Sequence, residues 1–469
     1  MPAYGTQTPR VLRDEGQPAC SIRLVRKKTL EAALQDLSAG QRTWVEANGF
    51  AGKPGKTLIV PNADGSIATI LYGAPSPDPY AAFEPSGLRG TLPKGQYRFE
   101  GEKLDNPTVT ALGWALDGYR FDAYSEKKAA ETDLLVDDTV DLDELSRIHA
   151  GVTFARDLVN MPANELGPAE LADAALALAD RFGAESSVIT GAALLDNNFP
   201  LIHAVGAASD RAPRLIDFSW GDEAHPKLTL VGKGVCFDSG GLNLKPGNAM
   251  EVMKKDMGGA ANVLGLASMI MAAELPVRLR VLIPAVENAI SGSAFRPGDV
   301  FKSRKGLTVE IGNTDAEGRL ILADALALAD VEEPDLLIDM ATLTGAARVA
   351  TGPDLPPIFT DDDGFAEAVC AAGLDLCDPV WRLPLWKPYS KLLTSKVADV
   401  NHISAGPFAG AITAALFLKR FVGKSRTWAH FDIHAWMPSA KPARPQGGAA
   451  QAIRALFDVI RKRYTASAD

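Results

Sequence analysis

From about residue 165 to the end of the chain, strand-like and helix-like segments alternate. Short apolar segments rich in β-branched residues have the composition of buried strands: 228–231, 278–286, 336–340 and 428–433. Helical patterns of apolar residues lie between or after them: about 258–273, 317–330, 409–422 and 448–463. This alternation favours an α/β domain whose mostly parallel central sheet is flanked by helices. In such sheets, ligands bind beyond the carboxyl ends of the strands.

The first 140 residues have a different texture. Strand-like runs at 57–60 and 68–72 are separated by Pro- and Gly-rich turns such as 74–79. An acidic stretch then leads into a helical pattern over about 143–159, which ends before Pro162. The sequence therefore predicts three parts: a smaller α/β N-terminal domain at 1–140, a linker helix at 141–164 and a larger C-terminal domain at 165–469.

Two short, glycine-flanked segments of the C-terminal domain are crowded with charge. Residues 231–247 read VGKGVCFDSGGLNLKPG and follow a predicted strand, and residues 313–320 read NTDAEGRL and precede a predicted helix. With the residue that soon follows the first segment, they bring these charged side chains: Lys233, Asp238, Lys245, Asp256, Asp315, Glu317 and Arg319. Carboxylates held close together repel one another unless a multivalent cation neutralises them. We therefore expect a metal centre of oxygen ligands, with room for two ions.

The spacing of the acids supports this expectation. Asp315 and Glu317 are two residues apart, so on an extended segment their side chains point the same way. Four carboxylates can hold two divalent ions about 3.5–4 Å apart when some of them bridge. The alternative for Asp256 and Asp315 is a role as helix N-caps, which aspartate favours.

Each of the basic residues in these segments could have one of two roles. Lys233 is either a metal ligand, as the neutral amine that a nearby dication makes accessible, or a charge partner of the carboxylates. Lys245 and Arg319 are suited to stabilise an oxyanion that develops in a transition state. Their alternative role is surface salt bridging, as is common for lysine and arginine.

Taken together, these motifs resemble those of the leucine aminopeptidase family, which are cytosolic two-metal exopeptidases. The resemblance spans roughly residue 145 to the end, whereas the first 140 residues match only loosely. Beyond VGKG-x-x-FDSGG and NTDAEGRL it covers further segments: ARDLVN at 155–160, ATLTGA at 341–346, ADVN at 398–401, AGAITAALFL at 409–418 and WAHFDI at 428–433. An eight-residue acidic motif paired with a second motif at a set distance is highly specific.

The resemblance implies a role for each site residue. One metal would be held by Asp238, Asp315 and Glu317, and the other by Lys233, Asp238, Asp256 and Glu317. Lys245 would polarise the scissile carbonyl and stabilise the gem-diolate, while Arg319 would bind a bicarbonate that acts as general base for a metal-bridging water. The substrate's free α-amine would bind one metal. Substrate-binding residues would be Met253, Asn313, Thr342, Leu343, Gly345, His434 and Met437. His434 stands where familiar members carry alanine, so we expect weaker preference for leucine and better turnover of smaller or polar first residues.

The resemblance also implies Zn²⁺ or Mn²⁺ as the metals, a macrodomain-like N-terminal domain, peptide substrates with a free N-terminus and a homohexamer.

The composition of the chain indicates where the protein is located and which partners it binds. The net charge of −10 argues against nucleic acid as the primary partner. No run of about 18 apolar residues occurs and the N-terminus lacks a signal-peptide core, so we expect neither export nor a membrane anchor. The four scattered cysteines are expected to be reduced thiols of a cytoplasmic protein.

Other classes of protein fit less well. The run Asp238-Ser239-Gly240-Gly241 echoes the nucleophile segment of chymotrypsin-like serine proteases, but that fold is all-β and needs an upstream histidine. The candidates His149 and His203 lie in helix-like or apolar contexts. Residues 232–234 lack the spaced glycine and following Ser/Thr of a phosphate-binding loop. A DNA-binding role would be secondary, and a salt-dependent gel shift would test it.

Overall fold

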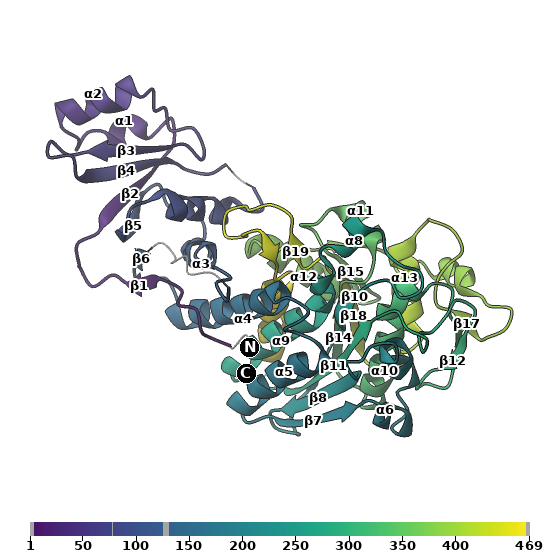
Figure 1. Ribbon diagram of the computed structural model, residues 1–469. Helices are drawn as coiled ribbons and strands as arrows, with labels where there is room; N and C mark the ends of the chain where they lie inside the picture. The colour runs from purple at the N-terminus through teal and green to yellow at the C-terminus, as the bar shows by residue number, and fades with distance from the viewer. Residues whose placement is uncertain (1–3, 77, 125–130, 466–469) are drawn as a thin grey trace. The chain divides into compact units, whose positions relative to one another are not determined.

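The computed structural model describes residues 4–76, 78–124 and 131–465. It divides into two compact units (Figure 1). The smaller unit is formed chiefly by Gln7–His149 and also includes Ser439–Gln446. The larger unit is formed chiefly by Ala150–Pro438 and continues after Gly447. Each unit is described separately below.

The smaller unit contains a six-stranded sheet in the order β1-β6-β5-β2-β4-β3. Neighbouring strands are parallel except for the β3–β4 pair. The strands are β1 (Val11–Arg13), β2 (Cys20–Val25), β3 (Thr57–Pro61), β4 (Ile67–Gly73), β5 (Gly95–Gly101) and β6 (Thr132–Val136). The helices are α1 (Leu30–Ala33), α2 (Ala39–Ala47), the 3₁₀ segment η1 (Ala81–Thr91) and α3 (Pro107–Asp117). The two strands predicted from the sequence here are confirmed as β3 and β4.

The larger unit is organised around a nine-stranded sheet in the order β16-β15-β18-β14-β9-β11-β8-β7, with β10 also paired to β11. Its centre, β18-β14-β9-β11, is parallel, while β15, β8 and β7 add antiparallel pairs toward the edges. The strands are β7 (Glu185–Thr190), β8 (Arg214–Trp220), β9 (Lys227–Gly232), β10 (Gly234–Asp238), β11 (Arg278–Asn288), β14 (Leu336–Ala341), β15 (Pro357–Thr360), β16 (Trp381–Arg382) and β18 (Thr427–Asp432). The four predicted strands are confirmed as β9, β11, β14 and β18.

Helices cover both faces of this sheet (Figure 1). One layer contains α9 packed on α14, and the other contains α10 packed on α13. The helices are α4 (Leu142–Asn160), α5 (Pro168–Arg181), α6 (Ala193–Asp196), α7 (Pro200–Gly206), α8 (Gly247–Met250), η2 (Met253–Met257), α9 (Gly258–Ala272), η3 (Thr314–Ala316), α10 (Glu317–Val331), α11 (Gly345–Thr351), α12 (Asp363–Asp375), η4 (Lys387–Leu393), α13 (Gly410–Lys419) and α14 (Ile453–Thr465). Small sheets add β12 (Val300–Lys302), β13 (Thr308–Glu310), β17 (Val400–Asn401), β19 (Trp436–Met437) and β20 (Gly447–Gly448).

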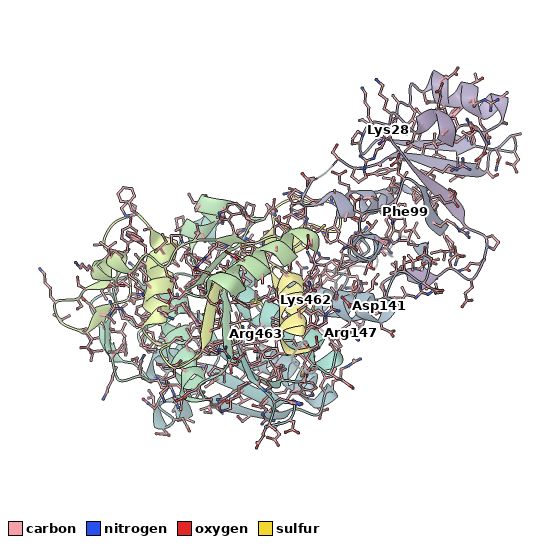
Figure 2. All side chains as sticks on the ribbon, turned by 180° about the vertical axis from the view of Figure 1, so that it is seen from behind. Lys28, Phe99, Asp141, Arg147, Lys462 and Arg463 are labelled. Atoms are coloured by element: carbon pink, nitrogen blue, oxygen red, sulfur yellow. The ribbon has the colours of Figure 1, made fainter. Side chains whose placement is uncertain are left out.

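Burial on both faces explains why the central strands are apolar. Every residue of β14 is buried, including Asp339. Asp339 accepts hydrogen bonds from Trp428 Nε1 at 2.8 Å and contacts His430 Nδ1 at 2.5 Å, so its charge has partners inside the sheet. Near the C-terminal end of α14, Arg463 donates to Asp335 and Lys462 pairs with Asp458. Figure 2 labels Lys462 and Arg463 on this helix. The carboxylates of Asp339, Asp335 and Asp458 thus each have a polar partner close by.

One local expectation was wrong. Asp315 and Glu317 lie on a 3₁₀ turn and a helix start, not on an extended segment. Residues 234–238 form strand β10, which pairs in parallel with β11. The alternative role of Asp256 and Asp315 as helix N-caps does not hold, because Asn313 caps η3 and the residue before α9 is Met257. Within the described residues, no helix is long and apolar enough to span a membrane.

Candidate metal centre and substrate cavity

The carboxyl ends of the parallel strands bring the charged segments together. Lys233 directly follows β9, and Asp238 is the last residue of β10. Thr342 follows β14, and His434 lies two residues beyond β18. Because these strands are parallel neighbours, their carboxyl ends meet at one edge of the sheet, which is where α/β proteins bind ligands.

Lys233 stands at the buried inner part of this edge. Its Nζ lies 2.7 Å from Asp256 Oδ2 and 2.9 Å from Glu317 Oε1, and it donates to the carbonyl oxygen of Thr342 at 3.0 Å. Thr342 Oγ1 in turn donates to Asp256 Oδ1 at 2.7 Å. A β-carbon added at Gly318 would come within 2.4 Å of Lys233 Cε, so only glycine there leaves room for this lysine.

Lys245 holds a second, less buried pair of acids. Its Nζ lies 2.8 Å from Asp238 Oδ2 and also contacts Asp315 Oδ1. Asp238 is oriented from the other side, because Asn288 Nδ2 and the amide of Gly240 both donate to its Oδ1 at 2.9 Å. Asn288 is the last residue of β11, so the sheet itself positions the carboxylate.

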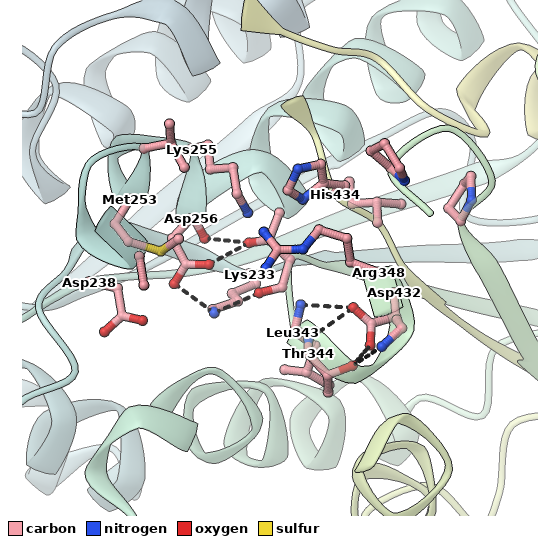
Figure 3. Close-up of a pocket in the computed structure, with 18 of the residues that line it drawn as sticks. Lys233, Asp238, Met253, Lys255, Asp256, Leu343, Thr344, Arg348, Asp432 and His434 are labelled. Carbon is pink, nitrogen blue, oxygen red and sulfur yellow. Dashed lines mark hydrogen bonds and ion pairs between the residues drawn. The ribbon is translucent and has the colours of Figure 1, made fainter. Parts of the chain in front are cut away.

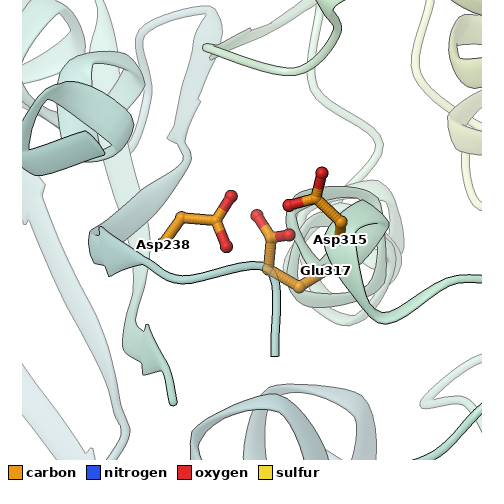
Figure 4. A group of neighbouring side chains, drawn as sticks. All are labelled: Asp238, Asp315 and Glu317. Carbon is orange, nitrogen blue, oxygen red and sulfur yellow. The ribbon is translucent and has the colours of Figure 1, made fainter. Parts of the chain in front are cut away.

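Three of the acids can share one cation. Asp238, Asp315 and Glu317 each offer an oxygen, and these oxygens lie within 4.8 Å of one another (Figure 4). The set contains carboxylates alone and no histidine, as the sequence predicted for this segment pair. Hard divalent cations and Zn²⁺ accept such oxygen ligands.

The local charge balance favours bound cations. Four carboxylates, from Asp238, Asp256, Asp315 and Glu317, face two ammonium groups. Burial, together with the charges of Glu317 and Asp256, raises the pKa of Asp238 to about 8. Burial opposes the charged form of Lys233, but the neighbouring carboxylates outweigh it and raise its pKa. The excess of negative charge is what divalent ions would neutralise, so the donor set fits a metal centre.

A cavity of about 410 Å³ opens from these residues (Figure 3). Most of the residues predicted as site residues line it: Lys233, Asp238, Lys245, Met253, Asp256, Asp315, Glu317, Thr342, Leu343, Gly345 and His434. We call the four acids with Lys233 and Lys245 the acidic end of this cavity.

Among the described lining residues, three predicted site residues are missing: Asn313, Arg319 and Met437. Asn313 Oδ1 accepts from the amide of Asp315 at 2.8 Å and so shapes the turn that carries that acid. Arg319 is buried on α10 and donates to the carbonyl oxygen of His402 at 2.7 Å. Met437 is buried in β19, which pairs with β20.

Several lining or supporting residues were not singled out from the sequence: Lys255, Asn288, Arg348 and Asp432. The clue for Lys255 was its position beside Asp256 on one 3₁₀ turn. Lys255, Arg348 and His434 together form what we call the basic end of the cavity. Burial lowers the pKa of Lys255 to about 8. Burial and the charges of Lys255 and Arg348 lower the pKa of His434 to about 3, so its imidazole is neutral near pH 7.

Comparison with known proteins agrees with this geometry. The profile described as "Cytosol aminopeptidase family, catalytic domain" matches residues 153–457. The chain belongs to the cytosol aminopeptidase family. The profile of the family's N-terminal domain matches residues 20–137. The likeness found from motifs is thus confirmed and extends to the N-terminal part, where the sequence motifs matched only loosely.

Members of the cytosol aminopeptidase family resemble the chain over nearly its whole length. The "Probable cytosol aminopeptidase" of Syntrophotalea carbinolica is 37% identical, with 98% of each chain covered. That of Xanthomonas oryzae pv. oryzae (strain MAFF 311018) is 46% identical over 87% of this chain and 88% of the relative.

Solved structures of the family show the same two-domain fold. The crystal structure of the cytosol aminopeptidase from Coxiella burnetii has a TM-score of 0.92 at 44% identity, covering 97% of this chain and 100% of that chain. The bottromycin maturation enzyme BotP, in a structure described as a complex with Mn, has a TM-score of 0.83 at 33% identity, with 97% and 100% covered.

As a cytosol aminopeptidase family member, the protein is a metal-dependent hydrolase of peptide bonds. The serine protease alternative does not hold, because the hydroxyl of Ser239 donates to the carbonyl oxygen of Asn288 at 2.7 Å in the middle of an α/β domain. A nucleophilic serine needs an adjacent base instead.

Proposed function

We propose that the chain removes the N-terminal residue from peptides by using two divalent metal ions, Zn²⁺ or Mn²⁺, held at the acidic end of the cavity. One observation carries the proposal. Four carboxylates converge at the acidic end of the cavity, where their ion pairs involve only two lysines. A structural salt-bridge cluster would pair its charges evenly, whereas this one leaves negative charge for cations.

The ligands divide between two ions. Asp238, Asp315 and Glu317 would hold one ion, and Lys233 as a neutral amine would join Asp238, Asp256 and Glu317 at the other. Asp238 and Glu317 would then bridge. When bound, such ions supply Lewis-acid polarisation of a carbonyl and lower the pKa of a water molecule. The surrounding hydrogen bonds from Asn288 and Thr342 would fix the orientation of the carboxylates.

Lys245 would serve the transition state. Its side chain is 13% exposed and lines the cavity, so its ammonium can reach a bound substrate. With cations bound by Asp238 and Asp315, the Lys245 ammonium would be free to donate to the oxygen of the scissile carbonyl. That interaction strengthens as negative charge develops on the oxygen, which is the condition for catalysis.

Arg319 would hold an anion near the centre. Its Nε is buried and has no hydrogen-bond partner among the described residues, so a donor is left for a small anion. A bicarbonate held there would supply a general base. The free α-amine of the substrate would bind at the acidic end, which restricts cleavage to the first residue. Met253, Thr342, Leu343, Gly345 and His434, with Asn313 and Met437 in support, would shape the pocket for its side chain.

We assign this reaction to residues 165–469, with 141–164 as a linker helix and 1–140 as an N-terminal domain. The family resemblance supports a homohexamer and a cytoplasmic location. Peptides with a free N-terminus would be the partners, rather than nucleic acid or membrane.

Metal removal tests the proposal. Chelation should abolish cleavage of an unblocked aminoacyl reporter, and Mn²⁺ or Zn²⁺ should restore it. The N-acetylated form of the same reporter should stay uncut in the reloaded enzyme, because its amine can no longer coordinate. Activity that persists in chelator, after metal analysis shows the protein to be stripped, would contradict the two-metal assignment.

A further inference from the structure

The basic end of the cavity is built by three separate elements. Lys255 comes from η2, Arg348 from α11 and His434 from the segment after β18. All three line the same cavity as the carboxylates, and in Figure 3 their side chains converge within it. The charges of both other residues also lower the pKa of His434.

Lys255 is buried without a counterion. Only 5% of the residue is exposed, and its ammonium makes no hydrogen bond or ion pair with any described residue. The acids whose charges act on it are Asp256 and Asp432. Asp256 is already bound to Lys233 and Thr342. A buried ammonium that is left unpaired destabilises the folded protein.

The carboxylate of Asp432 also accepts its hydrogen bonds from donors other than Lys255. Its Oδ1 accepts from the amides of Leu343 at 3.0 Å and Thr344 at 3.1 Å, and its Oδ2 accepts from Thr344 Oγ1 at 2.6 Å. These hydrogen bonds fix the loop between β14 and α11. Among the described residues, Asp432 therefore forms no ion pair with Lys255. The amide of His434 donates to Gln451 Oε1 at 2.9 Å, which anchors its backbone, while its ring makes no hydrogen bond with a described residue.

We propose that the basic end binds the side-chain carboxylate of the substrate's first residue, so that the enzyme favours peptides that begin with glutamate or aspartate. Lys255 would form the buried ion pair, Arg348 would contribute from the exposed rim, and His434 would offer a ring nitrogen. The inference rests on the proposed function, because the α-amine of the same residue must lie at the acidic end.

The reach of an acidic side chain suits this arrangement. Lys255 and Asp256 are consecutive, so their Cα atoms are about 3.8 Å apart, and Figure 3 shows their side chains beside each other in the cavity. Glutamate and aspartate likewise carry a carboxylate only a few bonds from their α-amine. One residue can therefore present its amine to the acids and its carboxylate to Lys255.

The test compares isosteres on the metal-loaded, full-length enzyme. The substrates are Glu-Ala-Ala-amide, Gln-Ala-Ala-amide and Leu-Ala-Ala-amide, whose amidated ends remove the only other carboxylate. We expect kcat/KM for the glutamyl peptide to exceed that for the glutaminyl peptide by about 10- to 100-fold, the usual strength of a hydrogen bond to a charged group. Lys255→Met should bring this ratio close to one while the leucyl peptide is still cleaved.

Lys254→Met is the matched control. It removes the same charge one residue away. Lys254 Nζ donates to the carbonyl oxygen of Asn160 at 2.6 Å and lies over the Trp436 ring, and Lys254 is not among the residues that line the cavity. Its glutamyl-to-glutaminyl ratio should match wild type. Arg348→Met, at an exposed position that folding tolerates, should lower the ratio by about threefold.

Two results would overturn the inference: a wild-type ratio at or below one, or a ratio that Lys255→Met leaves unchanged. A preference for Gln-Ala-Ala with a free C-terminus over its amide would also overturn it, because the bound carboxylate would then be at the other end of the peptide. Failure to cleave even the leucyl peptide after metal loading would count against the proposed function instead. Calorimetry of free L-glutamate against L-glutamine gives a readout without turnover, and tighter glutamate binding should disappear in Lys255→Met.

Discussion

At the acidic end of the cavity, four carboxylates and two lysines are tied together by ion pairs of 2.7–2.9 Å and by the further Lys245–Asp315 contact. At the basic end, among the described residues, Lys255 and Arg348 have no ion-pair partner and the His434 ring has no hydrogen bond. The first arrangement leaves excess negative charge and the second leaves excess positive charge. Buried charge that a protein does not neutralise itself specifies the charge of its ligand. The comparison therefore separates a cation-binding end from an anion-binding end.

The largest effect is expected from a bridging acid at the acidic end. Glu317→Gln removes a carboxylate charge that faces Lys233 and two other acids. We expect loss of bound metal and a fall in kcat/KM of more than about 10³-fold, because the site then has too few anionic ligands. Metal analysis alongside kinetics checks this. Glu333→Gln, the same change in a surface pair with Lys424, should retain both metal and activity. Full metal content in Glu317→Gln would contradict the assignment of Glu317 as a metal ligand.

Lys245 should behave differently from the acids that it contacts. Lys245→Met is expected to keep both metals and to lose about 10²–10³-fold in kcat, the usual value of one donor to a developing oxyanion. The measurement is kcat, KM and metal content on the same preparation. If the variant loses metal in step with activity, Lys245 organises the ligands rather than the transition state.

Gly318→Ala tests how tightly Lys233 is seated. An added β-carbon would lie 2.4 Å from Lys233 Cε and 2.7 Å from its Nζ, so the lysine must move away from Asp256 and Glu317. We expect a loss of about 1–3 kcal/mol in the free energy of unfolding, as for overpacked cores, and weaker metal binding. Denaturant unfolding and metal titration check these. Gly364→Ala in α12, where only Asp362 Oδ1 lies nearby at 3.7 Å, should be neutral or stabilising.

At the basic end, His434 should control the size and polarity of the pocket. His434→Ala enlarges it, so we expect the leucyl-to-alanyl ratio of kcat/KM to rise by about tenfold, within the range that pocket methylenes provide. Leucyl, alanyl and polar reporters measured on both proteins decide this. Unchanged ratios would mean that the imidazole does not limit the bound side chain.

The smallest effect concerns salt. Arg348 is exposed and Lys255 is buried. Raising ionic strength from about 0.05 to 0.5 M should therefore screen only the contribution of Arg348 and lower the glutamyl-to-glutaminyl ratio by about twofold. Arg348→Met should show no such dependence. A ratio that collapses with salt in both proteins would show that Lys255 is reached by solvent.

The sequence predicted the acidic end far better than the basic end. Asp238, Asp315 and Glu317 lie in two short motifs, so local spacing already indicated that they act together. The elements that carry them were also readable, since buried strands such as β9 and β14 are continuously apolar.

Residues brought in by tertiary folding could not be recognised in this way. Arg348 is far from Lys255 in the sequence, and it looks like an ordinary solvated cation until α11 and η2 are placed around one cavity. Asn288 orients Asp238 across 50 residues, through the pairing of β10 with β11. The turn at Asp315 was misjudged as extended because its conformation depends on the Asn313 cap and on the hydrogen bonds that link Thr314 with Asn243.

The strand order of the larger sheet has a consequence for protein synthesis. Lys233 and His434 flank the same cavity, yet the ribosome adds them roughly 200 residues apart, an interval on the order of ten to forty seconds at about 5–20 residues per second. Strand β18 lies between β14 and β15, so the sheet is incomplete until β18 emerges. A nascent chain therefore carries acidic motifs without a finished cavity. The order of translation therefore delays completion of the cavity until β18 and the segment after it have been synthesised.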